Sequence, residues 1–316
     1  MTACALNAGS EPEMQVSMDK FSAACDNFGL TISTKKTEVM HQPIPRTPYH
    51  EPTIMVKGQK LQAVEQFTYL GSTLSRAVNI DAEVNNRLAK ASSAFGRLRT
   101  NVWERRGISS STKLKVYSAV VLTTLLFACE SWTVYRRHAR QLNRFHMTCL
   151  RRILKIKWQD KVPDTEVLSK ANQQSVHTLL MRAQVRWAGH IARMPDERIP
   201  KQLLYGELSD GKRSVGGQKK RFKDTLKASL KSFSIDISTW DKVAVDRSTW
   251  RNLMYKGAQS HEERQIAEAK QKRELRKSRA ASTSATAVDS SLACPTCGRS
   301  FQARIGLISH LRTHKT

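Results

Sequence analysis

The sequence of 316 residues is poor in acidic side chains and has no long apolar run. Its 27 Asp and Glu face 53 Lys and Arg, which gives a formal net charge of +26 at pH 7. The longest apolar run, residues 119–129, has 11 residues and includes two threonines, whereas a membrane-spanning helix needs about 20. These absences exclude a helix that crosses a bilayer. They predict a polyanionic partner, with nucleic acid ahead of an anionic membrane surface.

Cysteine is scarce as well, because six Cys in 316 residues are too few for a disulfide scaffold. The chain also starts without the basic and apolar regions of a signal peptide, which favours an intracellular location, the nucleus rather than the cytoplasm. Neither a nucleophile elbow nor a phosphate-binding glycine loop occurs. His190 has no Cys or second His at metal-ligand spacing, so we expect it to pack or cap. Four cysteines without paired spacing are expected to be buried thiols: Cys4, Cys25, Cys129 and Cys149.

The first part of the chain has the pattern of one helix and a small sheet. Apolar residues recur at steps of three and four over 14–28, which predicts an amphipathic helix. Four prolines and five short strand-like segments follow, at 30–33, 37–40, 53–56, 60–64 and 67–70. Lys57 and Gly58 fit a hairpin turn. We expect a small sheet that packs against one helix.

Helical periodicity dominates from Ile80 onward, and 40% of the residues are apolar, which is enough for a core. The folded body is expected to end near Lys256. Residues 261–279 alternate Glu with Lys and Arg, which predicts a solvated helix, and the Ser-, Thr- and Ala-rich residues 280–292 predict a flexible linker. The fold class is therefore mainly α with a small β component. Helices are predicted at about 80–102, 113–135 after a serine cap at 109–111, 138–154, 175–193, and around Leu226 and Leu230.

Cationic side chains gather on two of these helices and on a glycine-rich loop at 206–223. The helix at 138–154 combines an apolar face with a cationic face. Such surfaces bind phosphates through counterion release and without sequence preference. We therefore expect nucleic-acid contacts at Arg137, Arg140, Arg144, Arg151, Arg152, Arg182, Arg186, Arg193, Lys212, Arg213, Lys219, Lys220 and Arg221.

The strongest motif lies near the C-terminus, where Cys294 and Cys297 are followed by twelve residues and then by His310 and His314. This is Cys2His2 spacing, in which two thiolates from a β-turn and two imidazoles one helical turn apart reach one tetrahedral Zn²⁺. The sequence therefore predicts a ββα zinc finger at 293–316 with one structural zinc ion.

Phe301 and Leu307 occupy the two apolar positions that form a core beneath the metal. The helix positions that face base edges in this fold, −1, 3 and 6, then fall on Ala303, Gly306 and Ser309. Ala and Gly cannot make a bidentate base contact, and Ser discriminates poorly. The finger is therefore expected to contact a protein, or phosphates through Arg304, Arg312 and Lys315.

Several blocks together resemble the C-terminal part of the endonuclease-reverse transcriptases of non-LTR (LINE-type) retrotransposons. Residues 25–38 (CDNFGLTISTKKTE) resemble the palm motif after the catalytic aspartate strand. Residues 67–72 (FTYLGS) resemble the primer-grip hairpin, and Tyr69, Leu70 and Gly71 are the primer-grip-like residues. Residues 186–196 (RWAGHIARMPD) and 212–224 resemble blocks further downstream in the family.

The resemblance covers residues 14–256 and implies a domain organisation. A partial palm and primer grip would occupy 1–75 and a helical thumb with its extension 76–256. Outside the resemblance, the charge pattern and the Cys2His2 spacing predict the charged helix and linker at 257–292 and the zinc finger at 293–316.

The catalytic signature of the family is missing. Template-directed nucleotidyl transfer needs two metals held by carboxylates, and no two adjacent aspartates occur in the sequence. We therefore expect a truncated element or a partial gene model without the catalytic strand. Lys36 resembles the family's lysine that assists the pyrophosphate leaving group, but without metals it is expected to be a solvated side chain. No catalytic residue is assigned, and enzymatic activity is not expected.

Two functions stay open. The first is a zinc-binding remnant of a retrotransposon reverse transcriptase that binds RNA or DNA largely without sequence preference. The second is a host zinc-finger adaptor or regulatory protein that contacts protein or DNA through its C-terminal finger. Binding that survives high salt would favour the adaptor. An active polymerase, a third possibility, requires carboxylates that the sequence does not contain.

Overall fold

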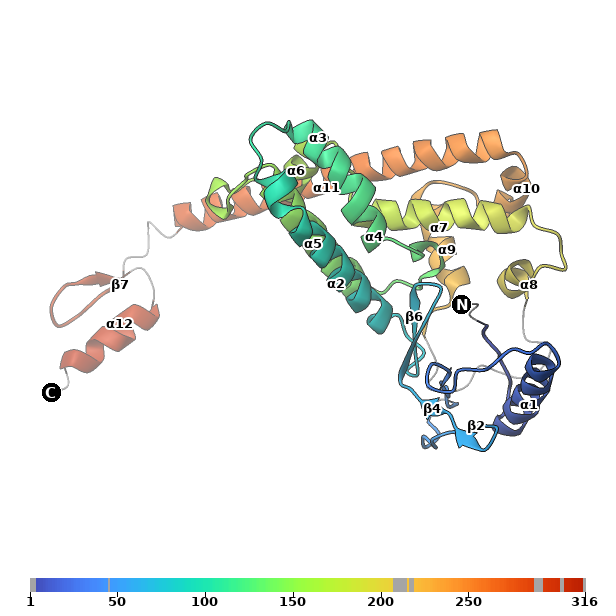
Figure 1. Cartoon of the computed structure of the whole chain (residues 1–316). Coiled ribbons are helices and arrows are strands. Elements are labelled where there is room, and N and C mark those ends of the chain that lie inside the picture. Colours follow the sequence, from blue (N-terminus) through green and yellow to red (C-terminus); the bar gives the residue numbers. More distant parts are fainter. Residues whose placement is uncertain are drawn as a thin grey trace. The chain divides into compact units, whose positions relative to one another are not determined.

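The computed structural model describes residues 4–44, 46–206, 215, 219–286, 292–301 and 304–314. The chain divides into two compact units, Met1–His261 and Glu262–Thr316 (Figure 1). Helices dominate and the strands are few and short, so the predicted fold class, mainly α with a small β component, is confirmed. No helix in the described part of the chain is long and apolar enough to span a membrane.

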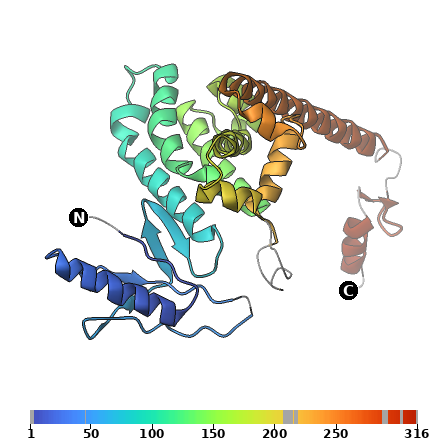
Figure 2. The same cartoon turned by 90° about the vertical axis from the view of Figure 1, so that its right-hand side faces the viewer.

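The first unit begins with helix α1 (Glu11–Asn27) and a group of short strands (Figure 2). The hairpin of β2 (Met55–Val56) and β3 (Gln59–Lys60) packs against α1, as Met18 shares a small core with Ile54, Val56 and Leu61. Lys57 and Gly58 form the predicted turn, with φ angles of 50° and 77°. The remaining strands pair as β1 (Glu38–Val39) parallel to β4 (Gln62–Ala63), and β5 (Gln66–Tyr69) antiparallel to β6 (Ser72–Ser75).

The strand predictions need correction. Except for β5, which matches the strand predicted at 67–70 to within one residue, the strands are shorter than predicted, and they form separate two-stranded ladders instead of one sheet. Residues 30–33 form no strand, because the Leu30 N–H donates to the Cys25 carbonyl at 2.7 Å and closes the end of α1. Strand β6 is an additional element, which its Ser- and Thr-rich sequence did not reveal.

The first of two helical cores lies between α2, α5 and the segments packed against them. Val84 and Ala91 of α2 and Leu142 and Leu150 of α5 are fully buried there. Helices α2, α5 and α7 confirm the helices predicted at 80–102, 138–154 and 175–193. The bounds are α2 (Asp81–Arg97), η1 (Arg99–Trp103), α3 (Ser110–Val116), η2 (Tyr117–Leu122), α4 (Thr123–Leu125), η3 (Cys129–Ser131), α5 (Arg136–Ile153), η4 (Trp158–Asp160), α6 (Asp164–Ala171) and α7 (Val176–Ala192).

The helix predicted over 113–135 ends earlier than expected. It starts at the predicted serine cap, where the Ser109 hydroxyl accepts from the Thr112 N–H at 3.1 Å, and its last α-helical residue is Leu125. Ala128 adopts a φ of 58°, and Trp132 turns into the core, where its carbonyl accepts from the Gln184 amide of α7 at 2.9 Å. Packing against α7 therefore replaces the last turns of this helix.

The second helical core is built by the later turns of α7 and the helices that follow it. Trp250 anchors this core, since its indole N–H donates to the Val185 carbonyl at 3.2 Å. A Cβ atom at Gly189 would lie 2.0 Å from the Trp250 Nε1, so only glycine allows this close approach. The helices are α8 (Ile199–Tyr205), α9 (Phe222–Ser232), which confirms the helix predicted around Leu226 and Leu230, α10 (Trp240–Ala244) and α11 (Arg247–Thr286).

Helix α11 corrects two boundaries. Its buried residues continue to Ala258 and His261, so the folded body extends beyond Lys256. The helix then runs on to Thr286, so residues 280–286 of the predicted linker are helical, while 287–291 lie outside the described residues. The alternation of Glu with Lys and Arg explains why a largely exposed helix persists here, since opposite charges at i and i+4 stabilise it.

The cysteine predictions are confirmed at three positions and wrong at one. Cys25, Cys129 and Cys149 are buried free thiols, and burial raises the pKa of Cys129 and of Cys149 to about 12. Cys4 is exposed because it precedes α1 and contributes to none of the cores. His190 is exposed and packs with its ring 5.3 Å from that of Trp187, as expected.

Candidate metal centre and nucleic-acid interface

The second unit contains the predicted ββα finger. Strands β7 (Leu292–Ala293) and β8 (Ser300–Phe301) pair antiparallel, and α12 (Arg304–Leu311) follows with a last turn η5 (Arg312–His314). The Cys294 N–H donates to the Arg299 carbonyl, and the Gly298 N–H donates to the Cys294 carbonyl, both at 2.9 Å. Gly298 has a φ of 71°, which glycine adopts without strain. This turn brings the two cysteines to the end of α12.

The four predicted ligands converge. The ligand atoms of Cys294, Cys297, His310 and His314 all lie within 4.8 Å of one another. The His310 Nε2 is 3.0 Å from both the Cys297 Sγ and the His314 Nε2. Zinc bonds of about 2.3 Å to sulfur and about 2.0 Å to nitrogen place tetrahedral ligands roughly 3.3–3.8 Å apart. Small side-chain shifts therefore suffice for this group to hold one metal ion, and no other group of three or more such ligands converges among the residues that the structure describes.

The local electrostatics favour the ligating forms of these side chains. Burial alone would raise the pKa of Cys294, but hydrogen bonds from the backbone of Thr296 and Cys297 outweigh it and lower the pKa. Burial, together with the positive charges of His314 and Arg299, lowers the pKa of His310. A thiolate and a neutral imidazole are the forms that bind metal.

The finger helix presents few groups that could read bases. Leu307 and Phe301 are half-buried, and the Phe301 ring lies 4.8 Å from that of His310. A Cβ atom at Gly306 would meet Phe301 at 3.4 Å, so this predicted base-facing position adjoins the core. Ser309 is exposed, and Ala303 and Lys315 lie outside the described residues. The most exposed apolar side chain of this helix is Ile305, at 80%.

The predicted cationic contacts fall into two groups. The first group has exposed side chains that make no hydrogen bond or ion pair with any other described residue; it comprises Arg140, Arg144, Arg152, Arg186 and Lys219. Three of these follow one i, i+4 ridge of α5, at positions i, i+4 and i+12; the ridge spans about 18 Å along the axis and turns by about 120° around it. We call Arg140, Arg144 and Arg152 the α5 arginine row.

The described side chains of the second group contact other residues of the fold. Arg137 binds both carboxylate oxygens of Asp81, at 2.6 and 3.0 Å. Arg151 and Arg182 donate to other side chains, Asp164 at 2.7 Å and Gln174 at 2.9 Å. Arg193 donates to the Ala244 carbonyl at 2.5 Å, Arg221 pairs with Asp224 at 3.3 Å, and the Lys220 Nζ lies 5.8 Å from the Tyr135 ring centre. Lys212 and Arg213 lie outside the described residues.

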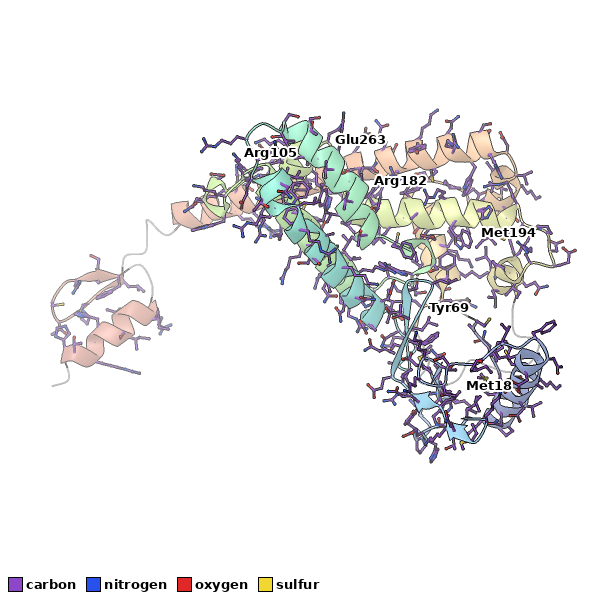
Figure 3. All side chains as sticks on the ribbon, viewed as in Figure 1. Met18, Tyr69, Arg105, Arg182, Met194 and Glu263 are labelled. Carbon is purple, nitrogen blue, oxygen red and sulfur yellow. The ribbon has the colours of Figure 1, made fainter. Side chains whose placement is uncertain are left out.

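The predicted primer-grip residues form the tip of the β5–β6 hairpin. Leu70 and Gly71 have φ angles of 48° and 87°, which makes a two-residue turn, and Leu70 is 76% exposed (Figure 3 labels Tyr69 at the end of β5). The carbonyl of Gly71 accepts from the Arg87 guanidinium of α2. The hairpin tip is therefore held by a helix and is not a free loop.

A buried ion pair on α2, which the sequence analysis missed, fixes this hairpin. The Arg87 Nε donates to Glu83 at 2.7 Å, and each side chain is 5% exposed. The second Glu83 oxygen accepts from the Thr73 N–H of β6, also at 2.7 Å. The only sequence signal was a Glu–Arg pair at i and i+4, which usually lies on a helix surface.

Comparison with known proteins finds a transposon-derived relative. The chain is 24% identical over 240 residues to an uncharacterized transposon-derived protein of Caenorhabditis elegans, which covers 72% of this chain and 83% of that protein. No protein-family model matches the chain, and no solved structure matches it. The similarity supports a transposon-related origin of the chain.

Proposed function

We propose that the chain is a remnant of a non-LTR retrotransposon reverse transcriptase that binds RNA or DNA through backbone contacts and carries one structural zinc ion. The transposon-derived relative, the family-like blocks and the converged Cys and His ligands support this origin. The proposal assigns no catalytic residue and places nucleic-acid binding on unit Met1–His261. A protein with this function would act where its RNA or DNA is present, in the nucleus rather than in the cytoplasm.

The α5 arginine row carries the nucleic-acid part of the proposal. The guanidinium group of an exposed arginine with no carboxylate partner is available to a phosphate, which it can bind bidentately. Arg140 and Arg144 lie about 6 Å apart along the helix axis, and Arg144 and Arg152 about 12 Å apart, so the three side chains can contact different phosphates of one backbone. The hairpin tip at Leu70 and Gly71, fixed on α2, is the second proposed contact and would touch the sugar-phosphate backbone of a primer strand.

Reversing the α5 arginine row is expected to weaken binding and to flatten its salt dependence. Each lost phosphate contact lowers the slope of log affinity against log salt by about 0.9 on a duplex, so Arg140→Glu, Arg144→Glu and Arg152→Glu together lower it by about 2.7. The affinity for an RNA–DNA duplex is expected to fall by about tenfold or more at low salt. Fluorescence anisotropy over a salt series measures both.

The matched control makes the same change in net charge elsewhere. Lys20→Glu, Lys35→Glu and Lys90→Glu replace three exposed cations that make no ion pair with a described residue. This control is expected to keep most of the slope. An equal loss in the control would show that net charge and not the α5 arginine row drives binding, and affinity that hardly changes with salt would remove the nucleic-acid proposal.

A second candidate function, a zinc-finger adaptor that contacts protein, is favoured by the exposed apolar side chains of Ile305 and Ile308 on the finger helix. Apolar contacts do not weaken as salt rises, unlike phosphate contacts. A partner complex that survives high salt and is lost in an Ile305→Asp, Ile308→Asp variant with its metal retained would support this function.

A further inference from the structure

Trp158 is the tryptophan that the fold leaves in solvent. Its side chain is 83% exposed, in the loop between α5 and α6, whereas Trp103, Trp132 and Trp250 are buried and the other two are half-buried. Tryptophan has the largest apolar surface of any side chain, so this exposure forgoes a large hydrophobic contribution. Such exposure is expected where a bound partner buries the ring.

The exposure does not come from a slack loop. The Arg151 guanidinium of α5 donates to the Val162 carbonyl at 2.8 Å and closes the loop across its base. The Asp160 carboxylate accepts from the Lys157 N–H at 2.7 Å, which fixes the turn that carries Trp158. The ring is thus presented by a hydrogen-bonded 3₁₀ turn, and ordering it on binding costs little conformational entropy.

The surroundings of the ring are cationic. The nearby carboxylates are already engaged, Asp160 by the Lys157 N–H and Asp164 by Arg151. The cations are exposed and have no ion pair with a described residue: Arg152, Lys155, Lys157 and Lys161. Lysine is depleted from protein–protein interfaces, whereas a stacking ring flanked by cations is how proteins bind single-stranded nucleic acid.

We propose that Trp158 stacks on an unpaired base of a single-stranded RNA or DNA whose phosphates are bound by the flanking cations. This rests on the proposed nucleic-acid function and gives it a strand preference. A base in a duplex has both faces covered by its neighbours, so only an unpaired base offers a free face. The α5 arginine row ends at Arg152, in the last turn of α5 before the loop that carries Trp158. A strand whose phosphates contact the row could therefore place its next base at the Trp158 ring.

The test compares Trp158→Ala, Trp158→Phe and the unchanged full chain. The probes are a single-stranded RNA of about 16 nucleotides and an RNA duplex of the same length, with affinities from fluorescence anisotropy at one salt concentration. Trp158→Ala is expected to weaken single-strand binding by about 10- to 100-fold and duplex binding by less than about twofold. Trp158→Phe keeps an aromatic face and is expected to retain most of the affinity. Leu203→Ala, which removes another highly exposed apolar side chain (77%), is the matched control and is expected to change neither.

The possible outcomes separate the two proposals. If the unchanged chain binds both probes and Trp158→Ala leaves single-strand binding intact, the stacking proposal is wrong and the proposed function stands. An equal loss on both probes likewise overturns stacking, because it would show a contact that does not need an unpaired base. If the unchanged chain binds neither probe, both proposals fail. Quenching of tryptophan emission by the single strand, absent in Trp158→Phe, would support stacking directly.

Discussion

Replacing Arg87 by methionine is expected to destabilise unit Met1–His261 by about 3–5 kcal/mol, because it leaves the Glu83 carboxylate buried without its cation. Both side chains are 5% exposed, so water cannot replace the lost partner. The loss should also release the hairpin tip, since the same guanidinium donates to the Gly71 carbonyl and lies 4.3 Å from the centre of the Phe127 ring. Urea unfolding monitored by circular dichroism measures the change.

Two further variants make this expectation specific. Glu83→Gln with Arg87→Met removes both charges and keeps a side-chain oxygen for the Thr73 N–H, so it is expected to recover most of the lost stability. Lys170→Met breaks an i, i+4 pair whose partner Glu166 is half-exposed, and is expected to cost less than about 1 kcal/mol. An Arg87→Met effect as small as that of Lys170→Met would contradict the role given to the buried pair.

In the proposed function the pair would matter because it joins the β5–β6 hairpin to α2. The Glu83 side chain lies between α2 and β6, and Arg87 reaches the turn at Gly71. Helices α2 and α5 pack together. In the proposed function, the hairpin and the α5 arginine row would therefore contact the nucleic-acid backbone at fixed positions relative to each other. Because Arg87 is buried, we expect Arg87→Met to weaken nucleic-acid binding only indirectly, by making the hairpin less ordered.

The parts of the fold that the sequence predicted are those set by local patterns. Cys294, Cys297, His310 and His314 were identified by their spacing alone, and the structure brings their ligand atoms together. Helices α2, α5 and α7 follow from apolar residues at steps of three and four. In each case, the residues that determine the element lie within a short stretch of the chain.

The predictions failed where contacts between residues far apart in the sequence determine the structure. The run up to residue 135 is apolar enough for one helix, but Trp132 gains its burial and a hydrogen bond from Gln184, 52 residues away. Arg137 and Arg151 looked like free surface cations, and their carboxylate partners, Asp81 and Asp164, belong to other helices. Charge along one helix shows which residues are cationic and leaves open which of them are available to a ligand.

Removing zinc is expected to unfold the finger at 292–314 and to leave unit Met1–His261 folded. The finger has little to hold it without a metal, because Phe301 and Leu307 are only half-buried and the described residues of α12 include no buried side chain. In zinc-finger peptides, metal binding supplies about 10–16 kcal/mol of apparent free energy, which becomes folding free energy. Four ligand atoms within 4.8 Å of one another would also repel or stay protonated without a cation between them.

Native mass spectrometry of the full chain is expected to show one zinc ion that a chelator removes and that Cys297→Ser fails to bind. Cys4→Ser, which alters the exposed cysteine outside the finger, is expected to keep the ion. Amide hydrogen exchange should show lost protection over 292–314 alone, because the cores of the first unit contain none of the ligands. The metal centre would be refuted if Cys297→Ser retained one zinc ion, or if the finger stayed protected after chelation. The independence of the first unit would be refuted if chelation removed protection at Val84 or Leu142.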